Sequence, residues 1–288
     1  MTSHDVVSFL RRTLKEKRIG HTGTLDPDAT GVLPICIGPA TRVAEYLTEH
    51  GKAYRAEMIF GVTTDTQDTS GHLVRRADPF VIPLSKLEQE LGRFRGTINQ
   101  LPPMTSAVSV QGKRLYELAR MGIEVERQPR SVEVSKLELV DAPLQLTCGS
   151  RVLVDIECSK GTYVRTICHD LGEHLGVGAV MSYLLRTRSG PFGIEDSMTL
   201  EEVVEASERG MINRVIQPIA KALTTMPQYQ VPDREVPRLQ NGMTIPVHDQ
   251  SWPADTLVLA LNHEGIALAV CVARGGKEQW LKPHKVFA

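Results

Sequence analysis

Hydrophobic and polar residues alternate along three stretches of the chain. The first stretch, residues 52–60, places four apolar side chains on one face, namely Tyr54, Ala56, Met58 and Phe60. Residues 131–140 and 151–158 alternate in the same way. Because alternation with a period of two is typical of strands that bury one face, we predict three strands. We expect the last two to pair within one sheet.

A spacing of three to four residues between apolar positions predicts a helix near the start of the chain. Ser3 or Asp5 can cap this helix, and we expect it to end near Lys17. Its apolar stripe consists of Val6, Phe9, Leu10 and Leu14. Further helices are expected from Pro39 to about His50, at capping boxes that begin with Ser85 and Thr199, and in a segment that ends at Gly176.

The pattern changes in the last quarter of the chain. Residues 216–227 are predicted to form a linker. From about Pro232 onwards the sequence is rich in β-forming residues and interrupted by glycine, which indicates a small β module.

Composition excludes several classes of protein. The 288 residues are 41% hydrophobic and carry a net charge of −1, so any binding of nucleic acid depends on local basic patches. The five cysteines form no C-x-x-C pair, which favours reduced, buried thiols over disulfides or a zinc site. No signal peptide or membrane-spanning apolar stretch is present in the sequence. His169, Asp170 and His174 come nearest to metal-ligand spacing, and we interpret them as a polar helix face.

One constrained loop, Gly20–Gly38, concentrates the residues that could carry chemistry. Gly20, Gly23, Gly31 and Pro27 exclude a long regular element, and the apolar run 32–37 anchors the end of the loop in the core. The loop presents polar side chains, among them His21, Thr22, Thr24, Asp26, Asp28 and Thr30. An ordinary turn rich in Gly and Asp would have the same composition.

Three chemical interpretations of this loop compete. A phosphate-binding loop would require a G-x-x-x-x-G-K-[ST] pattern, which is absent. The G-x-x-G clamp of a KH module matches residues 20–23, but Pro27 and Gly31 lie where that module needs a helix. The third interpretation is a catalytic carboxylate, either Asp26 or Asp28, although the two are too close in sequence to flank a sugar as a glycosidase pair.

The loop sequence GHTGTLDPDATGVLPIC closely resembles the catalytic motif of the bacterial tRNA pseudouridine-55 synthases, the TruB family. In that family the Asp of L-D-P is the essential carboxylate, which implies a catalytic role for Asp26. The His of G-H-T-G lies near the flipped target nucleotide, which implies a substrate contact for His21.

Three further segments resemble motifs of the same family. In GKAYRAEMIFGVTTDTQDTSG the resemblance places Tyr54 against the target base. In KGTYVRT it places Tyr163 in the nucleotide pocket, and it pairs Arg165 with Asp26, which should keep that carboxyl ionised. In YLLRT it places Leu184 at the base site.

The resemblance implies an α+β fold with a central mixed or antiparallel sheet and a small C-terminal β-rich module of the PUA type. The expected domains are a catalytic domain over residues 1–225 and the PUA-like module over 230–288. The expected activity is isomerisation of uridine 55 in the TΨC arm of tRNA, by base flipping and an aspartate-dependent rearrangement, with no cofactor and no metal. We expect a cytoplasmic monomer without a membrane partner. Contacts with the tRNA arm are expected from residues 113–130, and contacts with the acceptor end from Arg274, Lys277, Lys282 and Lys285.

Two rival functions remain at the level of sequence. A catalytically silent RNA-binding protein would use the same basic segments, but binding alone needs no loop carboxylate such as Asp26 to oppose the charge of RNA. A nucleoside glycosidase would not need the C-terminal module. Relatives usually begin with a strand that carries a Lys-Pro-x-Gly segment just before the stretch matching Thr2–Asp5, so we expect that strand to be missing from this sequence.

Overall fold

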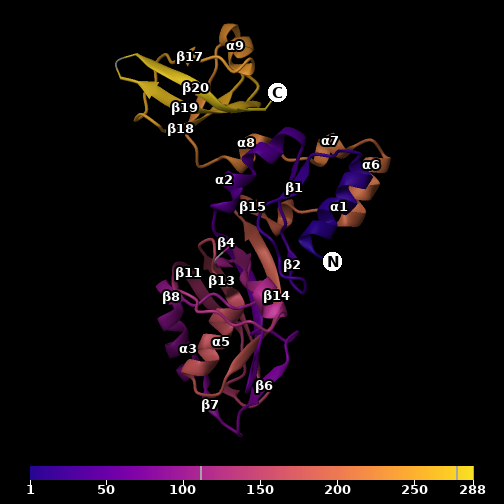
Figure 1. The fold of residues 1–288 in the computed structure, drawn as a ribbon, viewed down its shortest axis with the longest axis vertical. Helices are drawn as coiled ribbons and strands as arrows, with labels where there is room; N and C mark the ends of the chain where they lie inside the picture. Colours follow the sequence, from indigo (N-terminus) through magenta and orange to yellow (C-terminus); the bar gives the residue numbers. More distant parts are fainter. Residues whose placement is uncertain (111, 277, 288) are drawn as a thin grey trace. The chain divides into compact units, whose positions relative to one another are not determined.

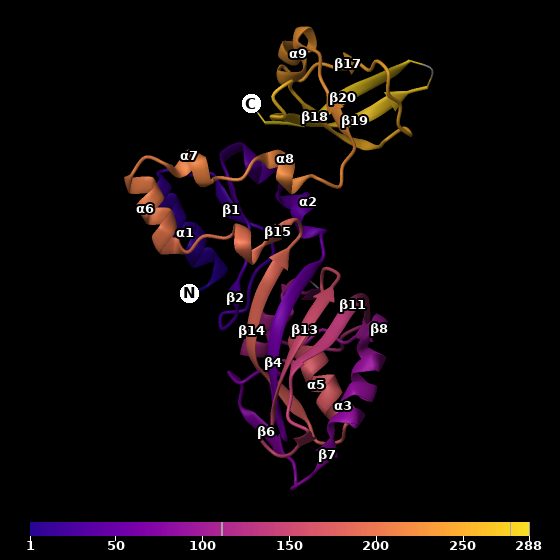
Figure 2. The same cartoon turned by 180° about the vertical axis from the view of Figure 1, so that it is seen from behind.

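The chain forms two compact units. A computed structural model describes residues 1–110, 112–276 and 278–287 (Figures 1 and 2). The sheet unit consists of Leu25–Val32 and His50–Ser189. The terminal unit consists of Met1–Thr24, Leu33–Glu49 and Gly190–Ala288. The loop Gly20–Gly38 therefore supplies residues to both units, and each unit is described here by itself.

The elements of the sheet unit are mainly strands. In chain order they are β2 (Thr30–Gly31), β4 (Lys52–Phe60), β5 (Val62–Thr64), β6 (Leu73–Arg76), β7 (Ile82–Pro83), α3 (Leu84–Leu91), the 3₁₀-helix η2 (Gly92–Phe94), β8 (Gly96–Gln100), β9 (Ser109–Val110), β10 (Lys113–Arg114), α4 (Leu115–Arg120), β11 (Arg130–Asp141), β12 (Gln145–Leu146), β13 (Arg151–Cys158), α5 (Val164–His174) and β14 (Ala179–Ser189).

The main sheet of this unit is mixed. Strands β14, β4, β13, β11 and β8 are neighbours in that order, and each pair is antiparallel. Strand β2 pairs with β14 in parallel. The three predicted strands correspond to β4, β11 and β13, and the predicted pairing of the last two is confirmed. The α+β class and the mixed sheet are confirmed as well.

The two faces of this sheet explain the alternation in the sequence. Val152, Val154 and Ile156 of β13 are fully buried, and they pack in one core with residues of α3 and α5 such as Leu87 and Ile167. Both helices lie against the sheet in Figure 1. Two of the residues that alternate with these three in β13 are charged, and they form ion pairs with other strands, Arg55–Asp155 at 2.8 Å and Arg188–Glu157 at 2.5 Å.

The elements of the terminal unit come from both ends of the chain. They are α1 (Ser3–Leu14), β1 (Ile19–His21), β3 (Ile35–Ile37), η1 (Gly38–Val43), α2 (Ala44–Thr48), β15 (Phe192–Gly193), η3 (Ile194–Asp196), α6 (Leu200–Glu208), α7 (Ile212–Val215), α8 (Ile219–Ala222), β16 (Gln228–Gln230), η4 (Asp233–Glu235), α9 (Val236–Gln240), β17 (Ile245–Pro246), β18 (Leu257–Leu261), β19 (Ala267–Gly275) and β20 (Gln279–Val286).

Several predicted helix ends are wrong. Helix α1 is capped by Thr2, with Asp5 completing the capping box, and it ends at Leu14 because Lys15 adopts a left-handed conformation with φ of 53°. The helix expected from Pro39 is a 3₁₀-helix followed by the short α2. Ser85 does not cap α3, whose N-cap is Pro83, whereas the capping box at Thr199 is confirmed.

The C-terminal module is a five-stranded sheet that is buried on both faces. Its strand order is β16-β18-β19-β20-β17. One face packs in a core with Tyr229 and Leu239. The other face contributes Leu259 and Val270 to a second core that contains Val43 and Leu47. The module thus shares its interior with the segment that follows the Gly20–Gly38 loop.

The predicted linker is part of that second core. Ala222 and Leu223 of residues 216–227 are buried there, and α8 lies within the same stretch. Polar contacts join the same regions. Arg42 donates a hydrogen bond of 2.5 Å to the carbonyl of Val286, and Lys285 pairs with Glu45 at 2.5 Å. The stretch is therefore a packed segment and not a free linker.

We expect Leu259→Ala to destabilise the protein by about 2–5 kcal/mol, because it empties a fully buried site that Val43 and Leu47 help to enclose. The measurement is urea denaturation followed by circular dichroism. Ile266→Ala is the control, since that side chain is 55% exposed and its loss should change stability by no more than about 0.5 kcal/mol. Equal midpoints for both variants would contradict the shared core.

Candidate active site

The Gly20–Gly38 loop is closed at its base by a short ladder within the terminal unit. Strand β1 pairs antiparallel with β3, so that Gly20 lies opposite Cys36 and His21 lies opposite Ile35. The amide of Thr22 adds a hydrogen bond of 3.0 Å to the carbonyl of Pro34. The structure thus places His21 on this ladder, partly buried.

The part of the loop in the sheet unit is fixed by strand β2. Thr30 and Gly31 pair with Leu185 and Arg186 of β14. Gly31 has a φ of 107°, and a Cβ atom at this position would lie 2.2 Å from the carbonyl oxygen of Arg186. Only glycine permits so close an approach of the two backbones. In the sequence, Gly31 is therefore a requirement of the pairing and not just a turn residue.

Asp26 lies beside a buried arginine. Arg165 is in the first turn of α5 with only 6% of its side chain exposed, and its Nη2 lies 3.6 Å from Oδ2 of Asp26. The same guanidinium lies 3.5 Å from Oδ2 of Asp68 and donates a hydrogen bond of 3.0 Å to the carbonyl of Thr105. One cation thus faces two carboxylates.

Asp68 is the site residue that the sequence analysis missed. Its Oδ1 accepts hydrogen bonds from Thr66 and from the amide and hydroxyl of Ser70, which orients Oδ2 towards Arg165. The segment is attached to β14 by backbone hydrogen bonds between Gln67, Thr69 and Met181. The signal in the sequence was the run of acidic and hydroxyl residues after β5, to which the sequence analysis assigned no role.

The pKa of Asp26 is raised from its ordinary value. Burial is the main cause, and the negative charges of Asp68 and Asp28 act in the same direction. The positive charge of Arg165 lowers the pKa, but burial outweighs it. Because 43% of the Asp26 side chain remains exposed, water still reaches the carboxyl group. The site holds a carboxyl group that is more basic than usual and paired with a cation, a combination suited to a nucleophile or a general base.

Tyr54 lies on β4 directly opposite Arg186 of β14. Burial raises the pKa of its hydroxyl group to about 12, and the charge of Asp26 contributes to the rise. Tyr54 is therefore a neutral phenol at ordinary pH. Its ring packs against the core of the sheet unit.

Of the other two predicted residues in this unit, Tyr163 contacts Arg165 and Leu184 lies in the core. Tyr163 caps α5, its backbone exchanges two hydrogen bonds with the side chain of Gln100, and its ring lies 6.0 Å from the guanidinium carbon of Arg165. Leu184 lies opposite Ala56 and is only 7% exposed within the hydrophobic core. Asp26, Tyr54, Tyr163, Arg165 and Leu184 all belong to the sheet unit.

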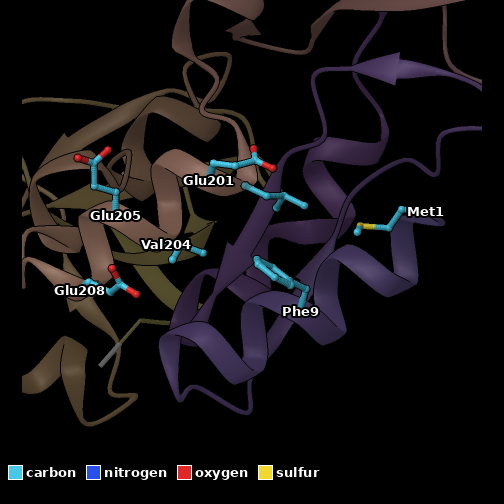
Figure 3. A pocket seen from close by; sticks show the side chains of 7 residues that line it. Met1, Phe9, Glu201, Val204, Glu205 and Glu208 are labelled. Atoms are coloured by element: carbon cyan, nitrogen blue, oxygen red, sulfur yellow. The ribbon is translucent and has the colours of Figure 1, made fainter.

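A separate pocket of about 330 Å³ lies between α1 and α6 in the terminal unit (Figure 3). Phe9 and Val204 form apolar walls, and three acidic side chains line it, namely Glu201, Glu205 and Glu208. The negative charge disfavours an anionic ligand, and none of the predicted site residues lines the pocket.

Among residues 1–110, 112–276 and 278–287, no three His, Cys, Asp or Glu side chains are grouped to hold a metal ion. No described helix has both the length and the apolar character needed to cross a membrane.

Comparisons with known proteins agree on one family. Residues 11–164 match the model of the TruB family pseudouridylate synthase N-terminal domain, and residues 165–224 match that of the tRNA pseudouridylate synthase B C-terminal domain. The chain is 52% identical to tRNA pseudouridine synthase B of Symbiobacterium thermophilum over 245 residues, which cover 84% of this chain and 79% of that protein. It is 45% identical to the protein of the same name from Heliobacterium modesticaldum over 100% of this chain and 92% of the relative.

Solved structures show the same likeness. A chain of a Cbf5-Nop10-Gar1 complex superposes with a TM-score of 0.76 at 29% identity, over 100% of this chain and 82% of that one. A chain of an H/ACA RNP bound to a substrate RNA containing 2′-deoxyuridine superposes with a TM-score of 0.75 at 27% identity, with the same coverage. The predicted fold and the predicted family are thereby confirmed.

The opposing charges around Asp26 predict opposite shifts of its pKa. Arg165→Gln removes the cation and is expected to raise the pKa of Asp26 further, whereas Asp68→Asn removes a negative charge and is expected to lower it. The measurement is a titration of the Asp26 carboxyl carbon by NMR, with Asp28→Asn used to separate the two loop signals. Shifts in the same direction for both variants would contradict the proposed balance of charges.

Proposed function

Because the chain belongs to the TruB family of pseudouridylate synthases and is a tRNA pseudouridine synthase, an isomerase, we propose that its target is uridine 55 in the TΨC arm and that Asp26 is its catalytic carboxylate. The observation that carries the proposal is the position of Asp26, 3.6 Å from the buried Arg165. A protein that only bound RNA would gain nothing from a carboxylate at this point, because the charge of RNA is negative.

The reaction moves the uracil from one attachment to another without adding or removing atoms. The bond between C1′ and N1 breaks, the base rotates, and a bond forms between C1′ and C5, after which the C5 proton is lost and N1 is protonated. A stacked base must first leave the helix, which costs a few kcal/mol. No redox step occurs and no group is transferred from outside.

Asp26 acts at the ribose in one of two ways. As a nucleophile it attacks C1′, and the electrons of the glycosidic bond leave with the uracil; the later attack of C5 on C1′ releases the carboxylate. As a base it removes the C2′ proton to give a glycal, and the proton returns when C5 bonds to C1′. Both routes need an ionised and basic carboxyl group. The raised pKa of Asp26 supplies the basicity, and Arg165 favours the charge.

The neighbouring side chains are assigned to the base. We propose that Tyr54 stacks on the flipped uracil, that Tyr163 and Leu184 shape its pocket, and that His21 is a further substrate-binding residue. The burial of Tyr54 supports this role, because a neutral phenol in an apolar wall provides both a stacking surface and a polar hydroxyl group. The contact of Tyr163 with Arg165 supports its place at the same site.

The basic residues are assigned to the rest of the tRNA. We propose that residues 113–130 contact the TΨC stem-loop and that a PUA-like module, residues 230–288, contacts the acceptor end as part of a monomer that acts in the cytoplasm. The net charge of −1 supports local recognition and not a general attraction to RNA. In the module, Arg274 forms an ion pair with Asp255 and Lys285 with Glu45, so both cations are already held in place. Lys277 lies outside the described residues.

Asp26→Asn is expected to lower the rate of isomerisation by about 10³-fold or more while tRNA binding changes little, because the variant loses the reacting group and keeps its shape. The substrate is unmodified tRNA, and the product is mapped by carbodiimide treatment and primer extension. Filter binding gives the affinity. An isolated TΨC stem-loop should also be modified by the natural enzyme.

Two controls make this experiment specific. Asp28→Asn changes the exposed carboxylate of the same loop and should leave the rate nearly unchanged. A tRNA with cytidine at position 55 should yield no pseudouridine. Equal losses in the two aspartate variants, or modification at another position, would overturn the assignment.

A further inference from the structure

Arg186 is a buried arginine to which the catalytic proposal gives no role. It lies near the end of β14 with 1% of its surface exposed, and it is among the largest fully buried side chains of the described residues. An arginine is almost never buried without specific partners, because removing its charge from water is costly. Its partners therefore indicate what the residue does.

One set of contacts joins Arg186 to the catalytic loop. Its Nε donates a hydrogen bond of 2.7 Å to the carbonyl of Val32, and its backbone carbonyl accepts one of 2.8 Å from the amide of Val32. Gly31 is its direct partner in the parallel pairing of β2 with β14. Both the side chain and the backbone of Arg186 thus bind the loop at Gly31 and Val32.

The second set of contacts joins Arg186 to Tyr54. The two residues lie opposite each other on β14 and β4, and their side chains form a hydrogen bond. A guanidinium group can only donate, so the Tyr54 oxygen must be the acceptor. The proton of the Tyr54 hydroxyl group must then point away from Arg186. The arginine therefore fixes the direction in which the phenol can donate.

The charge of Arg186 also acts on the hydroxyl group. Burial raises the pKa of Tyr54, and Arg186 opposes this rise. Burial lowers the pKa of Arg186, but an arginine in a protein remains charged. The pair is thus a cation and a neutral phenol, which is the state that a fixed donor to the substrate requires.

We propose that Arg186 is a positioning residue, which locks the Tyr54 hydroxyl group and the loop end Thr30–Val32 into one fixed arrangement. The inference rests on the proposed role of Tyr54 at the target base. Arg186 touches neither the reacting atoms nor the ribose in this scheme. It acts through the two elements that it connects.

The first test compares Arg186→Lys with Arg188→Lys in the full-length enzyme. Arg186→Lys keeps the charge and loses the fork of donors, so we expect the single-turnover rate on tRNA to fall about 10- to 100-fold, with the Kd for tRNA within about twofold of the natural value. Arg188 lies two positions further along β14, pairs with Glu157 at the surface, and its variant should keep the natural rate. A natural rate for Arg186→Lys would overturn the proposal.

The second test separates positioning from general support of the fold. Arg186→Lys and Tyr54→Phe should not be additive, because both disturb one hydrogen bond, so the double variant should lose at least about fivefold less than the product of the single losses. Multiplied losses would overturn the proposal. Failure of the natural enzyme to form pseudouridine would instead count against the proposed function.

A third measurement applies if Arg186→Lys does not unfold cooperatively. The natural enzyme and Tyr54→Phe are labelled with ¹⁵N-arginine, and the Arg186 Nε–H signal is identified by its contact with the Val32 segment. Loss of the Tyr54 hydroxyl group should shift this signal and speed its exchange with water. An unchanged signal would show that Arg186 does not hold Tyr54, and would overturn the proposal.

Discussion

The candidate site depends on the pairing of two short pieces of backbone. Strand β2 contributes only Thr30 and Gly31, yet its parallel pairing with β14 fixes the part of the loop that carries Asp26. The pairing is possible only because Gly31 lacks a side chain, since a Cβ atom would meet the backbone of Arg186 at 2.2 Å. The position of the proposed catalytic carboxylate thus follows from a steric condition at Gly31.

Burial and the charge of Arg165 have opposite effects on the pKa of Asp26. Burial and the nearby Asp68 make the carboxyl group more basic, while Arg165 keeps its ionised form accessible. Neither effect alone would serve the role proposed for Asp26, because an unpaired buried carboxyl group would remain protonated and a strongly paired one would be a poor nucleophile or base. The guanidinium group of Arg165 faces both Asp26 and Asp68. The negative charge of Asp68 therefore offsets part of the lowering that Arg165 causes in the pKa of Asp26.

Sequence reasoning succeeded where local pattern and burial coincide. The alternation in residues 131–140 and 151–158 records which side chains face the core, so the pairing of β11 with β13 could be predicted. The long motif around Asp26 led to the pairing of Asp26 with Arg165 across a large separation in sequence. Asp68 was missed because its place is set by backbone bonds to Met181, a tertiary contact with no local signature. Arg186 was passed over because the sequence of its strand does not show that, unlike Arg188, it is buried and bonded to Val32.

The second core of the terminal unit has a consequence for the order in which the protein is made. Val43 and Leu47 pack in one core with Leu259 and Phe287, which are synthesised much later. Arg42 donates a hydrogen bond to Val286, which is 244 positions away in the sequence. At about 5–20 residues per second this interval is about 10–50 s, during which the apolar segment that follows the Gly20–Gly38 loop lacks its partners from the C-terminal sheet. The sheet unit can assemble first from its nearly continuous stretch, His50–Ser189. A nascent chain would then have a folded sheet unit while the apolar residues near its N-terminus are still exposed. Exposed apolar surface of this kind is what chaperones bind.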